Sequence, residues 1–234
     1  MLISTDPHQN QILNSLAKCE FDRLAPNLEL VTLALGQTIC ESGAKPNYVY
    51  FPTSGIISIL NVMENGASAE IAVVGNEGIL GISVFMNGGS TPSRAVVQSA
   101  GSSYRIKANL LLNEFNLAES LQRLLLRYTY ALMTQMAQTA ACNRHHTIDQ
   151  QLCRWLLLSF DRLDGDTLLM TQELIANMLG VRREGVTEAA CNLQSSGLIK
   201  YSRGKITILN RPKLEKRCCE CYEVVKLEFD RLLN

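Results

Sequence analysis

The chain has 234 residues, 22 basic and 22 acidic side chains, and a formal net charge of zero. Hydrophobic residues make up 47% of it, which is ordinary for a globular protein of one large or two modest domains. No apolar run approaches the roughly 18 residues that a membrane helix needs, and the opening stretch MLISTDPHQNQIL lacks the pattern of a signal peptide. These features argue against a membrane-spanning protein and predict a cytoplasmic one with reduced cysteines.

The pattern of apolar residues and glycines in the first half of the chain changes near residue 28. Residues 1–27 carry apolar residues at helical spacing and are predicted to form short helical turns. Between about Leu28 and Lys107, short runs of β-branched and aromatic residues alternate with glycines. The dipeptide Asn65-Gly66 within this region is typical of a tight hairpin. Many short strands with regular turn signals predict an antiparallel sandwich or barrel.

A long helix is predicted next, because residues 109–140 contain neither glycine nor proline. One side of it carries an apolar stripe at spacings of three and four residues, which comprises Leu121, Leu125, Tyr128, Leu132 and Met136. Other sides are apolar too, so one side could pack on the sheet of the same chain and another against a second copy. We predict a homodimer joined through this stripe; a helix packed only on its own sheet is the alternative.

Two short helical patterns separated by Gly180 follow in residues 170–199. Thr171 is suited to cap the first helix, and Gly180 supplies the left-handed residue that ends it. A second helix is predicted to begin at about Arg182, and two strand-like runs joined at Arg203-Gly204 come after it. This order is typical of a winged helix-turn-helix, although periodicity alone fits an ordinary helical hairpin equally well.

The local charge favours DNA as the partner of this segment. Residues 182–217 hold 9 basic and 3 acidic side chains, and a local cationic patch matters more to a polyanion than the charge of the whole chain. The first turns of the second helix in such a motif reach base edges, so the predicted base contacts are Arg182, Arg183, Glu184, Thr187 and Glu188. The predicted contacts to the DNA backbone are Thr171, Gln172, Arg203 and Lys205.

These patterns resemble the Crp/Fnr family of bacterial transcription regulators. The resemblance spans nearly the whole chain and is strongest in MTQELIANMLGVRREGVTEAACNLQSSGLIKYSRGKITILN. It implies an α+β protein: an N-terminal antiparallel β-roll (a jelly roll like the cyclic-nucleotide-binding domain), a long dimerisation helix and a C-terminal winged helix. It also implies a homodimer on palindromic double-stranded DNA, with RNA polymerase as a further partner. The best-known members place an arginine four residues after the Arg-Glu pair of the recognition helix. Arg183 and Glu184 match that pair, whereas Glu188 reverses the charge, so the half-site of those members does not carry over.

The resemblance implies an effector pocket in the β-roll. Relatives that bind cyclic nucleotides use a Gly-Glu-Leu stretch and a downstream Arg-Ser or Arg-Thr pair. Here Ile79 follows Gly78, and Ala95 follows Arg94, so two of the polar groups are missing. A cyclic nucleotide is therefore not expected, and an unknown small-molecule effector would contact Gly78, Glu77 and Arg94. Alternatively, Arg94 forms an ion pair with a carboxylate such as Glu70 or Glu77.

The eight cysteines are not expected to hold a metal or cofactor. Oxygen-sensing relatives carry a clustered N-terminal set for an iron–sulfur centre, but here the first 30 residues contain only Cys19. The Cys-Cys-Glu-Cys run at 218–221 would point around much of a helix and pack as small residues. The adjacent His145 and His146 diverge on a helix, which disfavours a shared ligand role.

We predict three parts, namely a β-roll sensor domain (1–108), a dimerisation helix with a hinge (109–142) and a DNA-binding domain (143–234). The predicted function is dimeric, sequence-specific regulation of transcription, with DNA affinity set by an effector in or against the β-roll. Two alternatives stay open: an interaction module that docks protein instead of DNA, and a cupin-type enzyme. The enzyme is disfavoured because His8, His145 and His146, the histidines of the chain, lie outside the β-rich region, so no catalysis is predicted.

Overall fold

The computed structural model describes residues 6–163 and 165–233. Its first part consists of short helical segments, namely η1 (Pro7–Gln9), α1 (Gln11–Asn14), α2 (Lys18–Leu24) and η2 (Ala25–Asn27). The predicted helical turns are therefore confirmed over the described residues. Asn10 ties this part to the β-sheets, because its side-chain amide donates to the carbonyl oxygens of Pro52 and Gly78 at 3.0 and 2.8 Å.

The β-rich region forms two sheets whose neighbouring strands are all antiparallel, with strand orders β1-β7-β3 and β2-β6-β4-β5. Apolar side chains such as Val49, Phe51 and Ile57 are fully buried in this region, as expected for alternating strands that face a shared core. The predicted antiparallel β-roll is confirmed. Its elements are β1 (Glu29–Leu33), β2 (Thr38–Cys40), β3 (Tyr48–Pro52), β4 (Ile56–Val62), β5 (Ser68–Val74), η3 (Ile82–Val84), β6 (Arg94–Ser99) and β7 (Gly101–Lys107).

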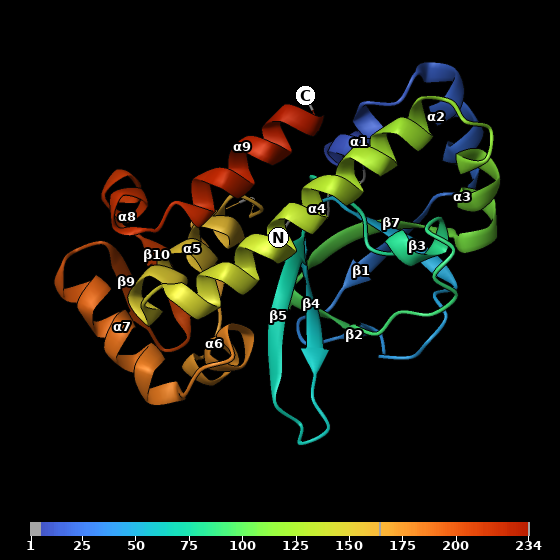
Figure 1. Ribbon diagram of the computed structural model, residues 1–234. Helices are drawn as coiled ribbons and strands as arrows, with labels where there is room; N and C mark the ends of the chain where they lie inside the picture. The colour runs from blue at the N-terminus through green and yellow to red at the C-terminus, as the bar shows by residue number, and fades with distance from the viewer. Residues whose placement is uncertain (1–5, 164, 234) are drawn as a thin grey trace.

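The hairpin of β4 and β5 projects from the β-roll (Figure 1). Its turn closes through a hydrogen bond from the Met63 amide to the Ala67 carbonyl at 2.8 Å. Gly66 has φ of 83°, a left-handed conformation that glycine adopts without strain. The hairpin predicted from Asn65-Gly66 is confirmed.

The predicted long helix is interrupted. It comprises α3 (Ala108–Phe115) and α4 (Ser120–His145), and Ala118 between them has φ of 60°. The carboxylate of Glu20, on α2, accepts hydrogen bonds from the Ser120 hydroxyl and from the Leu121 amide, so it satisfies donors at the start of α4. A side chain far away in the sequence therefore caps this helix, which explains why no local glycine or proline marks the break.

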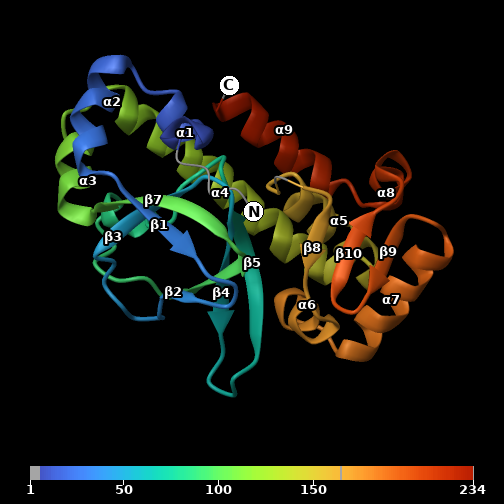
Figure 2. The ribbon, with the colours of Figure 1, turned by 180° about the vertical axis from the view of Figure 1, so that it is seen from behind.

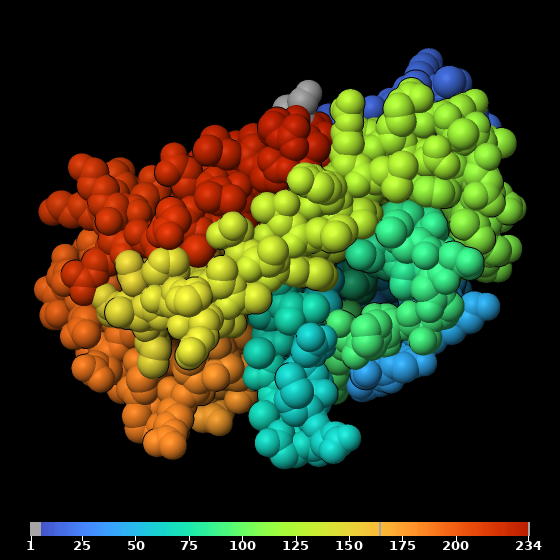
Figure 3. Space-filling model, in the orientation of Figure 1, coloured from blue at the N-terminus to red at the C-terminus, as the bar shows by residue number. Residues whose placement is uncertain are grey.

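The stripe predicted to contact a partner faces the chain's own core instead. Leu121, Leu125, Tyr128 and Leu132 are at most 1% exposed, and Met136 is half-buried. The predicted dimer contact is wrong for Leu121, Leu125, Tyr128 and Leu132, because the single chain already covers them. The opposite side of α4 crosses the front of the molecule as an exposed yellow-green ridge (Figure 3).

The C-terminal part is mainly helical and contains a small three-stranded sheet of order β8-β10-β9. The last helix, α9, lies beside α4 (Figures 1 and 2), where the rings of Tyr128 and Phe229 meet edge to face at 6.2 Å. None of the helices in the described ranges is long and apolar enough to cross a lipid bilayer. The elements are α5 (Ile148–Phe160), β8 (Thr167–Leu169), α6 (Gln172–Leu179), α7 (Arg183–Ser195), β9 (Ile199–Ser202), β10 (Lys205–Ile208), α8 (Arg211–Arg217) and α9 (Cys221–Leu233).

A buried chain of polar side chains joins the β-roll to α5. Glu70 on β5 accepts from the Trp155 indole at 3.0 Å and lies 2.5 Å from the Ser58 hydroxyl. The Ser58 hydroxyl also lies 2.8 Å from Oε1 of Gln98, and Nε2 of Gln98 donates to Ser159 at 2.9 Å. A serine hydroxyl has one proton to donate, so the chain is satisfied when Ser58 donates to Gln98 and a protonated Glu70 donates to Ser58. Burial accordingly raises the pKa of Glu70 to about 7.

Replacing Glu70 by glutamine is expected to remove a pH dependence of stability. Between the ordinary carboxyl pKa of 4.5 and the folded value of about 7, the folded state binds more protons than the unfolded state. The stability that this group contributes is therefore complete below that window and is lost as pH rises through it, by roughly 3 kcal/mol. Glutamine mimics the protonated acid, so the variant should be more stable than the parent at pH 8 and no more stable at pH 4.5.

Urea unfolding at a series of pH values measures this difference. Glu64→Gln is a matched control, because Glu64 lies exposed in the β4–β5 turn. A pH slope in Glu70→Gln equal to that of Glu64→Gln would show that folding does not raise the pKa of Glu70.

Candidate nucleic-acid interface

The segment around Gly180 folds as two helices joined by a tight turn. The Thr171 hydroxyl caps α6 by accepting from the Leu174 amide at 3.2 Å. Gly180 has φ of 66° and ends α6, and α7 begins three residues later. Both the cap and the stop match the predictions from the sequence. The inner face of α7 is buried, through Val186, Ala189, Ala190 and Leu193.

Helix α7 lies at the left-hand end of the molecule in Figure 1, and Gly180, in the turn before it, lies close to Ala69 of β5. Arg182, Arg183, Glu184 and Glu188 are exposed. Thr187 is half-buried, and its hydroxyl donor lies 2.8 Å from Oε1 of Gln172 and 3.0 Å from the Arg183 carbonyl. Thr187 therefore braces α7 against α6 as well as lying on the predicted contact face.

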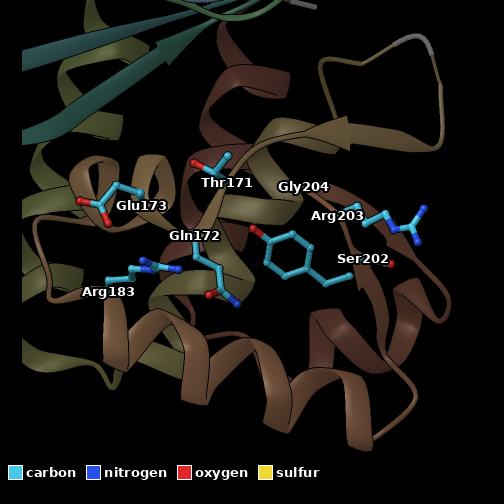
Figure 4. Close-up of a pocket in the computed structure, with 8 residues that line it drawn as sticks. Thr171, Gln172, Glu173, Arg183, Ser202, Arg203 and Gly204 are labelled. Atoms are coloured by element: carbon cyan, nitrogen blue, oxygen red, sulfur yellow. The ribbon is translucent and has the colours of Figure 1, made fainter.

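A hollow of about 480 Å³ lies where the starts of α6 and α7 meet the β9–β10 hairpin (Figure 4). It brings together Thr171, Gln172, Arg183 and Arg203 from the predicted set. Arg183 and Arg203 lie at opposite ends of it, so two cations flank a recess into which the positive end of α6 also opens. The two cations favour an anionic group such as a phosphate, whereas the carboxylate of Glu173, which also lines the hollow, opposes it. Lys205 is exposed on β10 but outside this hollow.

Tyr201 lines the same hollow and was missed by the sequence reasoning. Its hydroxyl donates to the Met170 carbonyl at 2.9 Å, and its backbone amide donates to Oε1 of Gln194 at 2.7 Å. Burial raises the pKa of this hydroxyl, which therefore stays neutral. An aromatic residue in a short strand is the only sequence signal for it, and that signal equally fits a core residue.

A second, larger cavity of about 960 Å³ lies between the β-roll and α4. Figure 3 shows a recess between the ridge of α4 and the green segments of the β-roll. Its walls are mainly apolar, with Ile59, Ile71 and Leu80 from the β-roll and with Leu132 and Met133 from α4. Gly78, Glu77 and Arg94 are not among the described residues that line this cavity, although Ser93 and Ala95, on either side of Arg94, are.

The three predicted effector residues have structural partners instead. Oε1 of Glu77 lies 2.7 Å from Nε of Arg162 on the far side of the core. A Cβ on Gly78 would lie 2.0 Å from the Tyr128 ring, so the glycine is needed for close packing. Arg94 pairs with Glu41 at 3.2 Å and donates to the Thr38 hydroxyl at 2.9 Å. An ion pair at Arg94 was the alternative prediction, but its carboxylate is neither Glu70 nor Glu77.

A β-roll with an internal cavity, a long connecting helix and an exposed winged helix-turn-helix define the class of a DNA-binding regulator with an effector domain. Two family models match the chain. The model of the cyclic nucleotide-binding domain matches residues 30–116, and the model of the Crp-like helix-turn-helix domain matches residues 150–217. Together they cover more than half of the chain.

Solved structures with the same fold are distant in sequence. A putative transcriptional regulator of the Crp/Fnr family from Eubacterium rectale is 20% identical, with a TM-score of 0.69, and the match covers 88% of this chain and 96% of that one. FixK2 from Bradyrhizobium japonicum is 17% identical, with a TM-score of 0.65 and coverage of 82% and 98%. TTHB099, a transcriptional regulator of the CRP family from Thermus thermophilus, is 17% identical, with a TM-score of 0.65 and coverage of 80% and 95%. A search of curated protein sequences found no match.

The chain belongs to the Crp/Fnr family of transcription regulators. It combines a helix-turn-helix for DNA with an effector-type β-roll, which confirms the predicted function class.

Proposed function

We propose that this protein acts in the cytoplasm as a homodimer that binds a palindromic DNA site through two copies of α7. The observation that carries the proposal is the exposed, charged start of α7 beside the recess between Arg183 and Arg203. In this proposal Arg182, Arg183, Glu184 and Glu188 read base edges, while Thr171, Gln172, Arg203 and Lys205 hold the backbone. The proposed division is a sensor domain at 1–108, a dimerisation helix with a hinge at 109–142 and a DNA-binding domain at 143–234; the last boundary falls within α4.

The proposed dimer uses the exposed side of α4. An apolar stripe with four- and three-residue spacing follows this side, and we call it the exposed stripe: Leu126, Tyr130, Met133, Ala137 and Ala140. Its large members are 47–58% exposed, which is unusual for side chains of this kind in the middle of a helix. A heptad spacing with small residues toward one end suits a parallel pair of helices that approach closely there. Pairing of α4 with a second copy would place two α7 helices across a dimer axis.

The cavity between the β-roll and α4 is the proposed effector site. Its apolar walls suit a small, largely apolar molecule better than a cyclic nucleotide, whose phosphate and ribose need polar partners. Met133 both lines this cavity and belongs to the exposed stripe. An effector in the cavity would therefore press on the same helix that forms the dimer, and would change the spacing of the two α7 helices. Two α7 helices can enter DNA half-sites about 34 Å apart only when their own spacing matches that distance.

Replacing Arg183 by alanine is expected to weaken binding to the preferred duplex by about 1–3 kcal/mol and to relax preference at one base position. The reason is that a bidentate contact of arginine to guanine is lost. Replacing Lys205 should instead weaken all duplexes alike and reduce the salt dependence of binding, because a phosphate contact is lost. Selection of bound duplexes from a random pool, followed by titration at several salt concentrations, measures both effects.

Lys226→Ala is the matched control, since this exposed cation lies on α9, away from the proposed interface. Recovery of no palindrome, or salt-independent binding to any duplex, would contradict the proposed function. Unchanged affinity and base preference in Arg183→Ala would show that the assigned contacts of α7 are wrong.

A further inference from the structure

Four side chains from two distant segments meet at the end of α4. Cys142 lies in the last turn of α4, and His146 caps its end. Cys219 lies in the connection between α8 and α9, and Cys221 is the first residue of α9. One ligand atom from each of the four lies within 4.8 Å of every other. The connection is not helical at 218–220, so the predicted spread of these cysteines around a helix is wrong.

Two of the distances between the four ligand atoms match those around a single tetrahedral ion. The sulfurs of Cys142 and Cys219 are 3.6 Å apart, and the sulfur of Cys221 lies 3.6 Å from Nδ1 of His146. A zinc ion with Zn–S bonds of about 2.3 Å and a Zn–N bond of about 2.0 Å separates neighbouring ligand atoms by about 3.5–3.8 Å. A disulfide would need sulfurs about 2.05 Å apart, and an iron–sulfur cluster would place several atoms between the cysteines.

The residue types of the four ligands and their spacing in the sequence also suit zinc. Structural zinc sites draw two ligands from each of two segments, commonly with three cysteines and one histidine. Cys142 and His146 are four residues apart at a helix end, so their side chains lie on the same face. Cys219 and Cys221 supply the second pair from the other segment. Not every cysteine of the chain belongs to this cluster: Cys19 and Cys191, for example, are exposed and are not among the four.

The surroundings of the four side chains supply the contacts that a zinc site needs. Nε2 of His146 lies 3.4 Å from a carboxylate oxygen of Glu220, which would orient the ring so that Nδ1 faces the ion. Arg154 is 4% exposed, and its positive charge acts on Cys142. Within the described part of the chain, Nε of Arg154 has no hydrogen-bond partner. Three thiolates and a divalent ion leave one negative charge, which this buried guanidinium would offset.

The four side chains are as buried as the ligands of a structural zinc site. Cys142, Cys219 and Cys221 are at most 6% exposed, so water would not compete for the bound ion. The side chain of His146 is 18% exposed, which leaves one route for the ion to enter. We infer that Cys142, His146, Cys219 and Cys221 bind a zinc ion that fastens the end of α4 to the start of α9.

The ion would stabilise the joint between the two halves of the protein. Helix α5 starts at Ile148, directly after the Thr147 cap, so the site adjoins the only backbone connection from α4 to the helix-turn-helix. Helix α9 lies along α4, and fixing its first residue would hold it there. The inference does not depend on DNA binding or on an effector, so it survives if the proposed function fails.

The test starts from the full chain purified under reducing conditions without chelator. Elemental analysis should find about one zinc ion per chain. Cobalt(II) added to the stripped protein should give the thiolate charge-transfer absorption and intense visible bands of a tetrahedral site with sulfur ligands. Zinc should raise the melting temperature of the stripped protein, since it binds only the folded arrangement.

Cys219→Ser should lower the zinc content at least tenfold and abolish the thermal shift. Cys218→Ser is the matched control, because this neighbouring cysteine is not among the four and should keep zinc at the parental level. His146→Ala removes the most exposed ligand and gives a second test if Cys219→Ser does not fold, with circular dichroism to check the fold.

The inference is overturned by any of three results. The first is a parent protein that contains no metal and gives no cobalt–thiolate absorption. The second is iron with inorganic sulfide in place of zinc. The third is loss of metal in Cys218→Ser to the same extent as in Cys219→Ser and His146→Ala.

Discussion

Replacing Arg162 by methionine is expected to lower the free energy of unfolding by about 3–5 kcal/mol. Nε of Arg162 lies 2.7 Å from Oε1 of Glu77, and the two side chains are only 6% and 10% exposed. Methionine keeps much of the apolar stem but leaves the Glu77 charge without its cation. Oε2 of Glu77 already has no hydrogen-bond partner among the residues that the structure describes. The cost is therefore the desolvation of an uncompensated carboxylate, which exceeds the net benefit of the pair itself.

Urea unfolding of three further variants separates this effect from lost packing. The double variant Arg162→Met with Glu77→Gln removes the stranded charge and should recover most of the loss. Arg231→Met breaks an exposed pair with Glu228 at 2.7 Å and should cost about 0–1 kcal/mol, since Arg231 is 63% exposed. If the double variant is as unstable as the sum of its single changes, the stranded-charge explanation is wrong.

The position of this pair gives it a second role. Glu77 follows β5 of the β-roll, and Arg162 lies just beyond the end of α5. The guanidinium of Arg162 also lies 5.6 Å from the ring of Phe229 on α9. Three parts of the protein therefore meet at one buried charge pair, beside the polar chain through Glu70 and Trp155. Because both contacts join the β-roll to α5, they hold the helix-turn-helix in one orientation relative to the effector-type cavity.

Local signals in the sequence predicted the helix-turn-helix well. The Thr171 cap, the left-handed Gly180 and the turn at Arg203-Gly204 each depend on the residue's own backbone preferences, and all three appear in the structure. The β4–β5 hairpin at Asn65-Gly66 is another such signal. Elements whose conformation is set by neighbouring residues can therefore be read from the chain alone.

Features set by distant residues could not be read in the same way. The start of α4 is capped by Glu20, which lies about a hundred residues earlier. The sequence near Ser120 does not predict this contact. The zinc ligands are split between the end of α4 and the start of α9, so neither segment alone has a complete set. The expected effector residues came from the resemblance to relatives that bind cyclic nucleotides, but Glu77 pairs with Arg162, which lies outside the β-roll.

The sequence also did not show which side of α4 the single chain leaves uncovered. The helix is apolar on two sides, and periodicity does not say which one the β-roll covers. The structure buries Leu121, Leu125 and Leu132, which leaves the exposed stripe for a second copy. This distinction makes the proposed dimer testable, because a substitution on the exposed stripe should spare the fold of the single chain.

Replacing Leu126 by glutamate is expected to raise the dissociation constant of the homodimer by about a hundredfold or more. Leu126 is 47% exposed in the single chain, so the fold does not depend on burying it. In a parallel pair of α4 helices the two new carboxylates would face each other in an apolar contact and would repel. Sedimentation velocity over a range of protein concentrations measures the change directly. Affinity for a palindromic duplex should fall with it, because a monomer engages one half-site at a time.

Leu35→Glu is the matched control, since Leu35 is 50% exposed on the turn between β1 and β2, away from α4. That variant should sediment and bind DNA as the parent does. The control matters because a new surface charge alone also weakens binding to a polyanion. If Leu126→Glu and Leu35→Glu dissociate to the same extent, another surface forms the dimer, and the link from the cavity through Met133 to the recognition helices is lost with it.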